Sequence, residues 1–187
     1  MLDVALTFLV DQLNAYLRTR TSTAADVAKL SRIVNDLGKW STGPNAIGLA
    51  LINVEEDRVL KGQTPETTII DGRHVVLPPP LKLNLTVIFV ADFDQYDIAL
   101  KYLSYILTYF QAHPKFAQQD HPDLDPRIEK LVVELQSLTY EQLNQVWAFI
   151  GAKQLPSAIY KVRLVALQDQ APDIVPAVTK VRVEAAR

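Results

Sequence analysis

Apolar residues recur at helical spacing in two long segments of the chain. In residues 2–17, leucines and a tyrosine fall three or four positions apart, which predicts an amphipathic helix with one buried stripe. A stronger pattern of the same kind covers residues 95–112, with Asp92 or Asp94 as the expected N-cap. The predicted buried positions of this second helix are Tyr96, Ala99, Leu100, Leu103, Ile106, Leu107 and Phe110.

Alternation of apolar and other residues predicts β-strands elsewhere in the chain. It is clearest in residues 81–90, whose second face begins polar at Lys82 and ends apolar at Val90. We therefore expect this strand to run from an edge of the sheet into the core. Gly48 and Ala50 share one face of an earlier strand, which allows another segment to pack closely there. The predicted strands are residues 47–54, 81–90, 130–135, 158–167 and 178–183.

Other segments give weaker or shorter signals. Residues 27–37 fit either a helix or a strand followed by a loop, and residues 116–126 read as a polar loop. Thr139 with Gln142 matches a capping box, which predicts a short helix that ends at Gly151.

The order of these elements predicts an α+β fold for a single domain over residues 1–187. We expect a mainly antiparallel sheet of four to five strands with the helices packed on one face. Residues 55–73 form a long connecting arm, with room for a short hairpin around residues 67–70, and residues 172–187 form a C-terminal strand and tail. Connections as long as this arm are usually functional or disordered in compact domains.

Composition narrows the classes of function. The chain has 187 residues, a formal net charge of −2 and no Lys/Arg stripe, so we expect no nucleic-acid partner. It has no cysteine, which excludes disulfides and thiol catalysis. No apolar run is long enough for a membrane span, so we expect a soluble protein, cytoplasmic during assembly, that does not insert into membranes.

Candidate catalytic groups are few. The densest polar cluster, Asp120, His121, Asp123 and Asp125, offers ligands for a hard cation, and the alternative is a solvated loop with prolines as turn residues. Glu55 and Glu56 are adjacent and point to opposite sides of a strand, so they make a poor acid–base pair. No phosphate-binding glycine loop can be assembled from six glycines, and we expect no enzyme activity, metal or cofactor.

The helix over residues 95–112 has aromatic residues on a second face. Tyr102, Tyr105 and Tyr109 recur at three- and four-residue spacing beside the buried stripe. A helix that is apolar on two faces must be covered on both sides. The sequence leaves two explanations open, either core and flanking loop of the same chain or a partner subunit.

Two stretches resemble the N-terminal domain of the cap protein of phage-tail-like contractile injection systems. One runs from the three prolines at residues 78–80 to Phe116, and the other from Leu143 to Arg163. With Asn53 to Glu56 and Arg58 to Leu60, the likeness covers nearly the whole chain. The Photorhabdus virulence cassette and the antifeeding prophage are examples of such systems.

The resemblance implies a tail terminator that forms a hexameric ring, ends the polymerisation of the inner tube and the contractile sheath, and links the two. Its partners would be further copies of itself, the inner-tube protein and the sheath protein within the injection-system particle. Alternatives are a metal-dependent hydrolase using the loop from Asp120 to Asp125, and a generic assembly adaptor. The candidate interface residues are Glu55, Glu56, Arg58, Arg73, Tyr102, Tyr105, Tyr109, Lys180 and Arg182.

Overall fold

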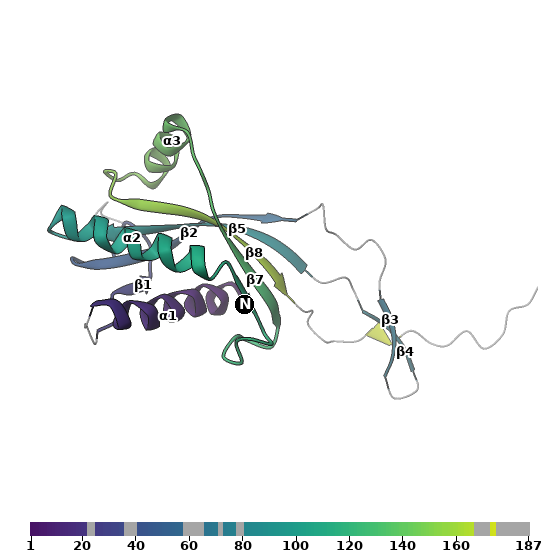
Figure 1. The fold of residues 1–187 in the computed structure, drawn as a ribbon. Coiled ribbons are helices and arrows are strands. Elements are labelled where there is room, and N and C mark those ends of the chain that lie inside the picture. The colour runs from purple at the N-terminus through teal and green to yellow at the C-terminus, as the bar shows by residue number, and fades with distance from the viewer. Residues whose placement is uncertain are drawn as a thin grey trace, which may run out of the picture.

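The computed structural model describes residues 1–21, 25–35, 41–57, 66–70, 73–77, 81–166 and 173–174. Its main body is a six-stranded sheet in the order β1-β2-β5-β8-β7-β6, with three helices around it (Figure 1). The β1–β2 pair is parallel and every other pair in this sheet is antiparallel, so the predicted α+β class with a mainly antiparallel sheet is confirmed. The strands are β1 (Ala28–Leu30), β2 (Ala46–Glu56), β5 (Leu81–Asp92), β6 (Lys115–Ala117), β7 (Ile128–Leu135) and β8 (Ser157–Ala166), and the helices are α1 (Leu2–Thr21), α2 (Tyr96–Ala112) and α3 (Tyr140–Ile150).

A second, three-stranded sheet consists of β3 (Glu66–Ile70), β4 (Arg73–Leu77) and β9 (Asp173–Ile174). Strands β3 and β4 pair as an antiparallel hairpin, in agreement with the hairpin expected around residues 67–70. The strand predicted over residues 178–183 lies outside the described residues. The assignment of residues 55–73 as an arm stays a prediction, because much of that segment also lies outside them.

Helices α1 and α2 lie together on one face of the large sheet and form the main core with it (Figure 1). The apolar stripe of α1 is buried, as its spacing predicted. On the sheet side, the alternate residues of β5 that face these helices are also buried. The contributing side chains are Leu6, Leu9, Leu13 and Leu17 of α1, Ala99, Ile106, Tyr109 and Phe110 of α2, and Leu85, Val87 and Phe89 of β5.

Helix α3 packs on the opposite face of the sheet, and this differs from the expectation that all helices share one face. The apolar end of the second face of β5, at Ile88 and Val90, is fully buried beneath Trp147 of α3 and beside Ile159 of β8. The physical reason is in the sequence of β5 itself, because a strand that is apolar on both faces needs a cover on each side. The strand count also differs, because the large sheet has six strands and the sequence predicted four to five.

Three local predictions are resolved by the structure. Residues 28–30 are strand β1, which decides the ambiguity of residues 27–37 in favour of a strand with a loop. The segment predicted as a loop from residue 116 begins with strand β6, whose Phe116 is fully buried in the main core. Helix α2 has Gln95 at its N-cap with no side-chain cap, not Asp92 or Asp94.

The expected N-cap Asp94 has a different partner. Its Oδ2 accepts a hydrogen bond of 2.9 Å from the Nδ2 of Asn45, and its backbone N–H donates to the Oδ1 of Asn45 at 3.3 Å. Asn45 adopts a left-handed backbone conformation with φ of 59°. The aspartate therefore ties the turn before β2 to the end of β5 instead of capping the helix.

Candidate functional site

Helix α3 is capped at both ends. The Oγ1 of Thr139 accepts from the backbone N–H of Gln142 at 3.2 Å, and the backbone N–H of Thr139 donates to the Gln142 Oε1 at 3.0 Å, which confirms the predicted capping box. Gly151 ends the helix with φ of 73°, in the left-handed region that glycine tolerates best. Between these ends, Trp147 is the one buried residue of the helix. Leu143, Val146 and Ile150 pack beside it but are only partly buried, so one fully buried side chain anchors this 11-residue helix.

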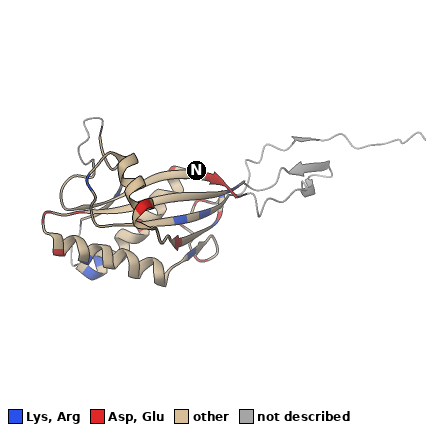
Figure 2. Ribbon diagram, turned by 90° about the horizontal axis from the view of Figure 1, so that it is seen from above, with Lys and Arg blue, Asp and Glu red and all other residues tan. Residues whose placement is uncertain are grey.

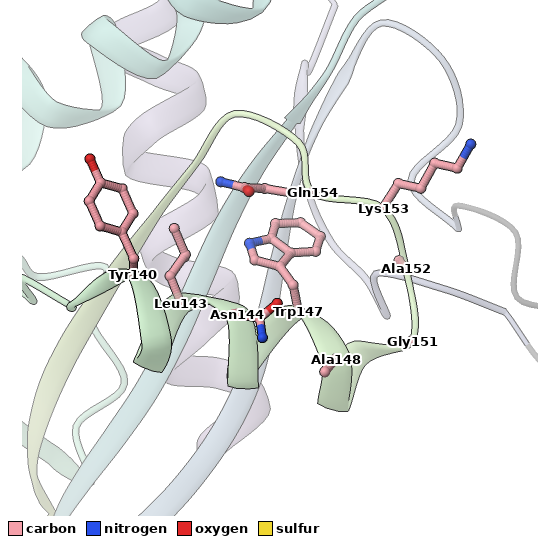
Figure 3. Close-up of a pocket in the computed structure, with 9 residues that line it drawn as sticks. All are labelled: Tyr140, Leu143, Asn144, Trp147, Ala148, Gly151, Ala152, Lys153 and Gln154. Carbon is pink, nitrogen blue, oxygen red and sulfur yellow. The ribbon is translucent and has the colours of Figure 1, made fainter.

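One open hollow follows the face of α3 that carries Trp147. Its volume is about 730 Å³, and it lies between that face and the return segment from Gly151 to Gln154. In Figure 3 the side chains of Trp147 and Gln154 point into the same space, whereas Lys153 points away from it. Tyr140, at the start of the helix, is 93% exposed at the mouth of this hollow.

Two further hollows, of about 500 and 210 Å³, continue between α2 and α3 and share Leu143 with the first. Tyr96 is 67% exposed and Leu100 42% exposed, although both were predicted to be buried. The prediction was wrong because α2 buries its neighbouring stripe through Ala99 and Phe110 and turns this one toward α3. We call this surface the α2–α3 groove, defined by Tyr96, Leu100, Leu103, Leu107, Leu138 and Leu143.

The chemistry of the groove suits association rather than catalysis. Among the described residues that line the three hollows there is no Asp, Glu or His, and Lys153 is their only charged side chain. The apolar character continues beyond the groove, because Leu135 and Phe149 are also large and exposed. Clustered apolar surface of this kind marks a place where another macromolecule binds.

A second exposed apolar surface lies at the opposite edge of the large sheet. Strand β1 pairs with β2 only at Ile47 to Leu49, and the rest of β2 continues past a bulge between Leu51 and Asn53. We call the exposed surface there the β2 edge patch, defined by Leu30, Leu51 and Val54, each about 40% exposed. Glu55 and Glu56 follow at once and are exposed.

The tyrosines predicted at an interface lie largely within the chain. Tyr109 is 5% exposed, and its ring is 5.1 Å from that of Tyr16 on α1. Tyr105 meets Tyr16 edge to face at 6.5 Å, and Tyr102 stacks on Phe93 at 4.5 Å. Of the two explanations that the sequence left open, the first holds for Tyr105 and Tyr109, because α1 of the same chain packs on them. The same burial raises the pKa of Tyr109 to about 12.

Only some of the charged interface candidates lie among the described residues. Glu55 and Glu56 project from the exposed end of β2, next to the β2 edge patch. Arg73 begins β4, and Arg58, Lys180 and Arg182 lie outside the described residues. Along the described helices and strands, positive and negative segments are interspersed (Figure 2). Their role at an interface stays a prediction.

In the acidic loop that was predicted as an alternative metal site, Asp123, Asp125 and His121 each contact a different residue. Asp123 accepts a hydrogen bond of 2.7 Å from Gln12, and His121 packs edge to face on Phe8. Asp125 accepts from Nε and Nη2 of Arg127 at 2.9 and 2.8 Å, and these bonds lower the pKa of Asp125 to about 2. Within the part of the chain that the structure describes, no three His, Asp or Glu residues gather as a metal site.

The fold has the architecture of the proteins that end the tubes of contractile injection systems. The PVC sheath/tube terminator of an extracellular contractile injection system, in its extended state, superposes with a TM-score of 0.59 at 16% identity, over 95% of this chain and 64% of that one. The tube-terminating cap of the anti-feeding prophage gives a TM-score of 0.55 at 15% identity, over 94% of this chain and 59% of that one. The chain thus spans about three fifths of the length of either protein.

The family model described as the Pvc16 N-terminal domain matches residues 5–180, so the chain belongs to that family. None of the curated protein sequences matches it significantly. Of the helices that the structure describes, none has the length and apolar character needed to cross a bilayer.

Proposed function

We propose that this chain is a structural terminator of a contractile injection system, which forms a ring on the end of the inner tube and the sheath. The observation that carries the proposal is the family match over residues 5–180, and the superposition on two terminators over nearly the whole chain supports it. The ring would stop the addition of tube and sheath subunits and join the two layers. It would be part of the assembled particle.

The surface of the protein fits this role. A ring subunit needs at least two contact surfaces on different parts of the molecule, because a head-to-tail contact uses a different patch on each side. Two exposed apolar surfaces, the α2–α3 groove and the β2 edge patch, are our candidates for such contacts. We propose six copies per ring, as in the sequence-based prediction, with the inner-tube protein and the sheath protein as further partners.

The other two hypotheses receive less support. A metal-dependent hydrolase would need the carboxylates of Asp120, Asp123 and Asp125 to converge, and two of them are engaged by Gln12 and Arg127 instead. The hypothesis of a generic adaptor of another machine does not account for the match to the Pvc16 N-terminal domain family. Catalysis is also not needed to end a polymer, so we propose a function without enzyme activity.

The proposal is tested by polymerising the cognate inner-tube protein with increasing amounts of this chain. We expect the mean tube length to fall as the ratio of chain to tube protein rises, and the chain to sediment with tubes in proportion to the number of ends. Sheared tubes, with more ends for the same mass, provide the matched control and should carry more chain. Tubes of unchanged length, or binding proportional to tube mass, would contradict the proposal.

A further inference from the structure

Strand β2 has one open edge over its second half. On its inner side it pairs with β5 along its length, from Ala46 to Glu56. On its outer side, β1 pairs only with residues 47–49, and no other described strand lies beyond β2 there. Among the described residues, β2 is therefore the margin of the sheet from Leu51 onward.

The hydrogen bonds around this edge show where its backbone groups point. Ile47 and Leu49 use theirs on the outer side, in bonds of 2.9 and 3.0 Å to the residues that flank β1. Past the bulge, the N–H of Asp57 donates to the β5 side at 2.9 Å. Because alternate residues of a strand direct their backbone groups to opposite sides, those of Leu51 and Val54 point outward. No described strand or turn pairs with them.

The two faces of this edge differ in chemistry. Leu51 and Val54, which are 38% and 41% exposed, lie on the face of the sheet that packs on α1 and α2. Asn53 and Glu55 lie on the other face and are exposed. An open row of backbone donors and acceptors beside exposed apolar side chains is a surface that binds an added strand. The strand that fits is apolar on one face and basic on the other.

The chain contains a segment with this pattern near its C-terminal end. Residues 178–183, which lie outside the described residues, are predicted from the sequence to be a strand. Their alternation puts Lys180 and Arg182 on one face and an apolar row centred on Val181 on the other. Pairing with β2 brings the basic face beside Glu55 and the apolar face beside the β2 edge patch, so both faces match.

The direction of the chain before this segment favours pairing with another copy. Strand β4 runs toward the large sheet, because only residues 78–80 separate it from β5. Strand β9 is antiparallel to β4, so the chain leaves Ile174 in the direction away from the large sheet. It would have to reverse within residues 175–177 to reach its own β2. Residues 175–187 can span about 40 Å when extended, which is enough to reach a second molecule.

We propose that residues 178–183 of one copy add as a strand to the open edge of β2 in the next copy, and that this contact joins the subunits of the ring. The contact uses a different part of each copy, so it repeats head to tail and closes when the rotation permits. Val181 lies beside Val54 of the neighbouring copy in this arrangement, with Lys180 and Arg182 on the side of Glu55. The inference rests on the proposed function, since it assigns the contact between its subunits.

The absence of cysteine in the chain makes a direct test simple. Val54→Cys and Val181→Cys are mixed on the ends of cognate inner tubes and treated with a short bis-maleimide crosslinker. The mixture should yield a dimer of two 20.9 kDa chains, and the variant with both cysteines should yield a ladder of higher species. If the double variant instead forms only an internal crosslink within one chain, the segment pairs with its own β2 and the proposal is wrong.

Matched controls separate a specific contact from random collision. Leu135 is 54% exposed on β7, and β5 and β8 lie between that strand and β2. Leu135→Cys mixed with Val181→Cys should therefore give no dimer above background, and each single variant alone should also give none. Efficient crosslinking of Val54→Cys alone would mean that two β2 edges pair with each other, which overturns the proposal.

Backbone pairing gives a second readout that does not depend on cysteine. Proline has no N–H to donate to a neighbouring strand, so Val181→Pro should weaken self-association of the chain several-fold. Ala185→Pro, two residues past the segment, is the matched control and should behave as the wild type. On assembly, the amides of Leu51 and Val54 should exchange hydrogen more slowly in the wild type than in Val181→Pro. Equal exchange at these amides before and after assembly of the wild type would contradict strand addition.

Failure of this contact can be told apart from failure of the proposed function. A wild-type chain that ends tubes, with no crosslink between positions 54 and 181 on those ends, overturns the strand addition alone. A chain that never binds tube ends overturns the terminator and the ring contact together.

Discussion

Tyr109 lies where α1, α2 and β6 meet, with its ring near those of Tyr16, Phe110 and Phe116. Burial and the nearby carboxylate of Asp123 raise its pKa from 10.0 to about 12. The folded state therefore holds the phenol proton more tightly than the unfolded state. Its contribution to stability is complete below about pH 10 and is lost as the pH rises toward 12.

This pKa shift predicts an alkaline loss of stability. The free energy of unfolding should fall by up to about 1.4 kcal/mol per pH unit above pH 10 on account of this group. Tyr109→Phe should make the fall shallower in urea titrations between pH 9 and 11, and Tyr140→Phe, at the exposed start of α3, should follow the wild type. If the free energy of unfolding falls equally steeply with pH in the wild type and in Tyr109→Phe, the pKa of Tyr109 is not raised in the folded state.

Gly48 is a second residue whose role can be tested. A Cβ added there would overlap the Cγ2 methyl of Thr42, which is itself buried. Gly48→Ala should lower the free energy of unfolding by about 1–3 kcal/mol, the usual cost of overpacking. Because Thr42→Ser removes that methyl group, the double variant should regain most of the loss in chemical denaturation. If Gly48→Ala unfolds at the wild-type denaturant concentration, Thr42 does not pack on this glycine.

At the level of elements, the sequence predicted the large features well. The period of α1, the alternation of β5 and the capping box of α3 all depend on local chemistry, and all three are found. The small residues of β2 predicted a close approach, and Thr42 makes it. The alternation of β5 also predicted an apolar second face without saying what covers it.

Tertiary contacts decide which apolar faces of α2 are buried, and the sequence pattern alone could not predict this. The stripe of α2 with Tyr96 and Leu100 is as apolar as the buried one, and only the position of α3 leaves it exposed. Tyr109 fits an interface equally well in sequence, and only the approach of α1 makes it core. The α2–α3 groove therefore could not be found by periodicity, although the excess of apolar residues on α2 was its signal.

The sparse anchoring of α3 predicts independent local opening. Thr139→Ala should cost about 1 kcal/mol through loss of the N-cap. Trp147 is the one buried residue of the helix. We therefore expect the amides of residues 143–150 to exchange hydrogen faster in Thr139→Ala than in the wild type, while exchange in β5 is unchanged. An equal loss of protection in β5 would mean that α3 unfolds only with the whole domain.

For the whole molecule, the described surface is better suited to assembly than to chemistry. Most of its large exposed apolar residues lie in the α2–α3 groove and the β2 edge patch, and Leu135, Tyr140 and Phe149 lie outside them. The carboxylates of Asp123 and Asp125 are occupied by separate partners. Burial of such exposed apolar surface against neighbouring subunits would be favourable, in keeping with the proposed ring.

The most direct test is an electron-microscopy reconstruction of tube and sheath assembled in the presence of this chain. The proposal predicts one layer of extra density with six-fold symmetry at a tube end, in contact with both tube and sheath, and no such density along the tube wall. Density spread along the wall, or bare ends in the presence of excess protein, would contradict a terminator.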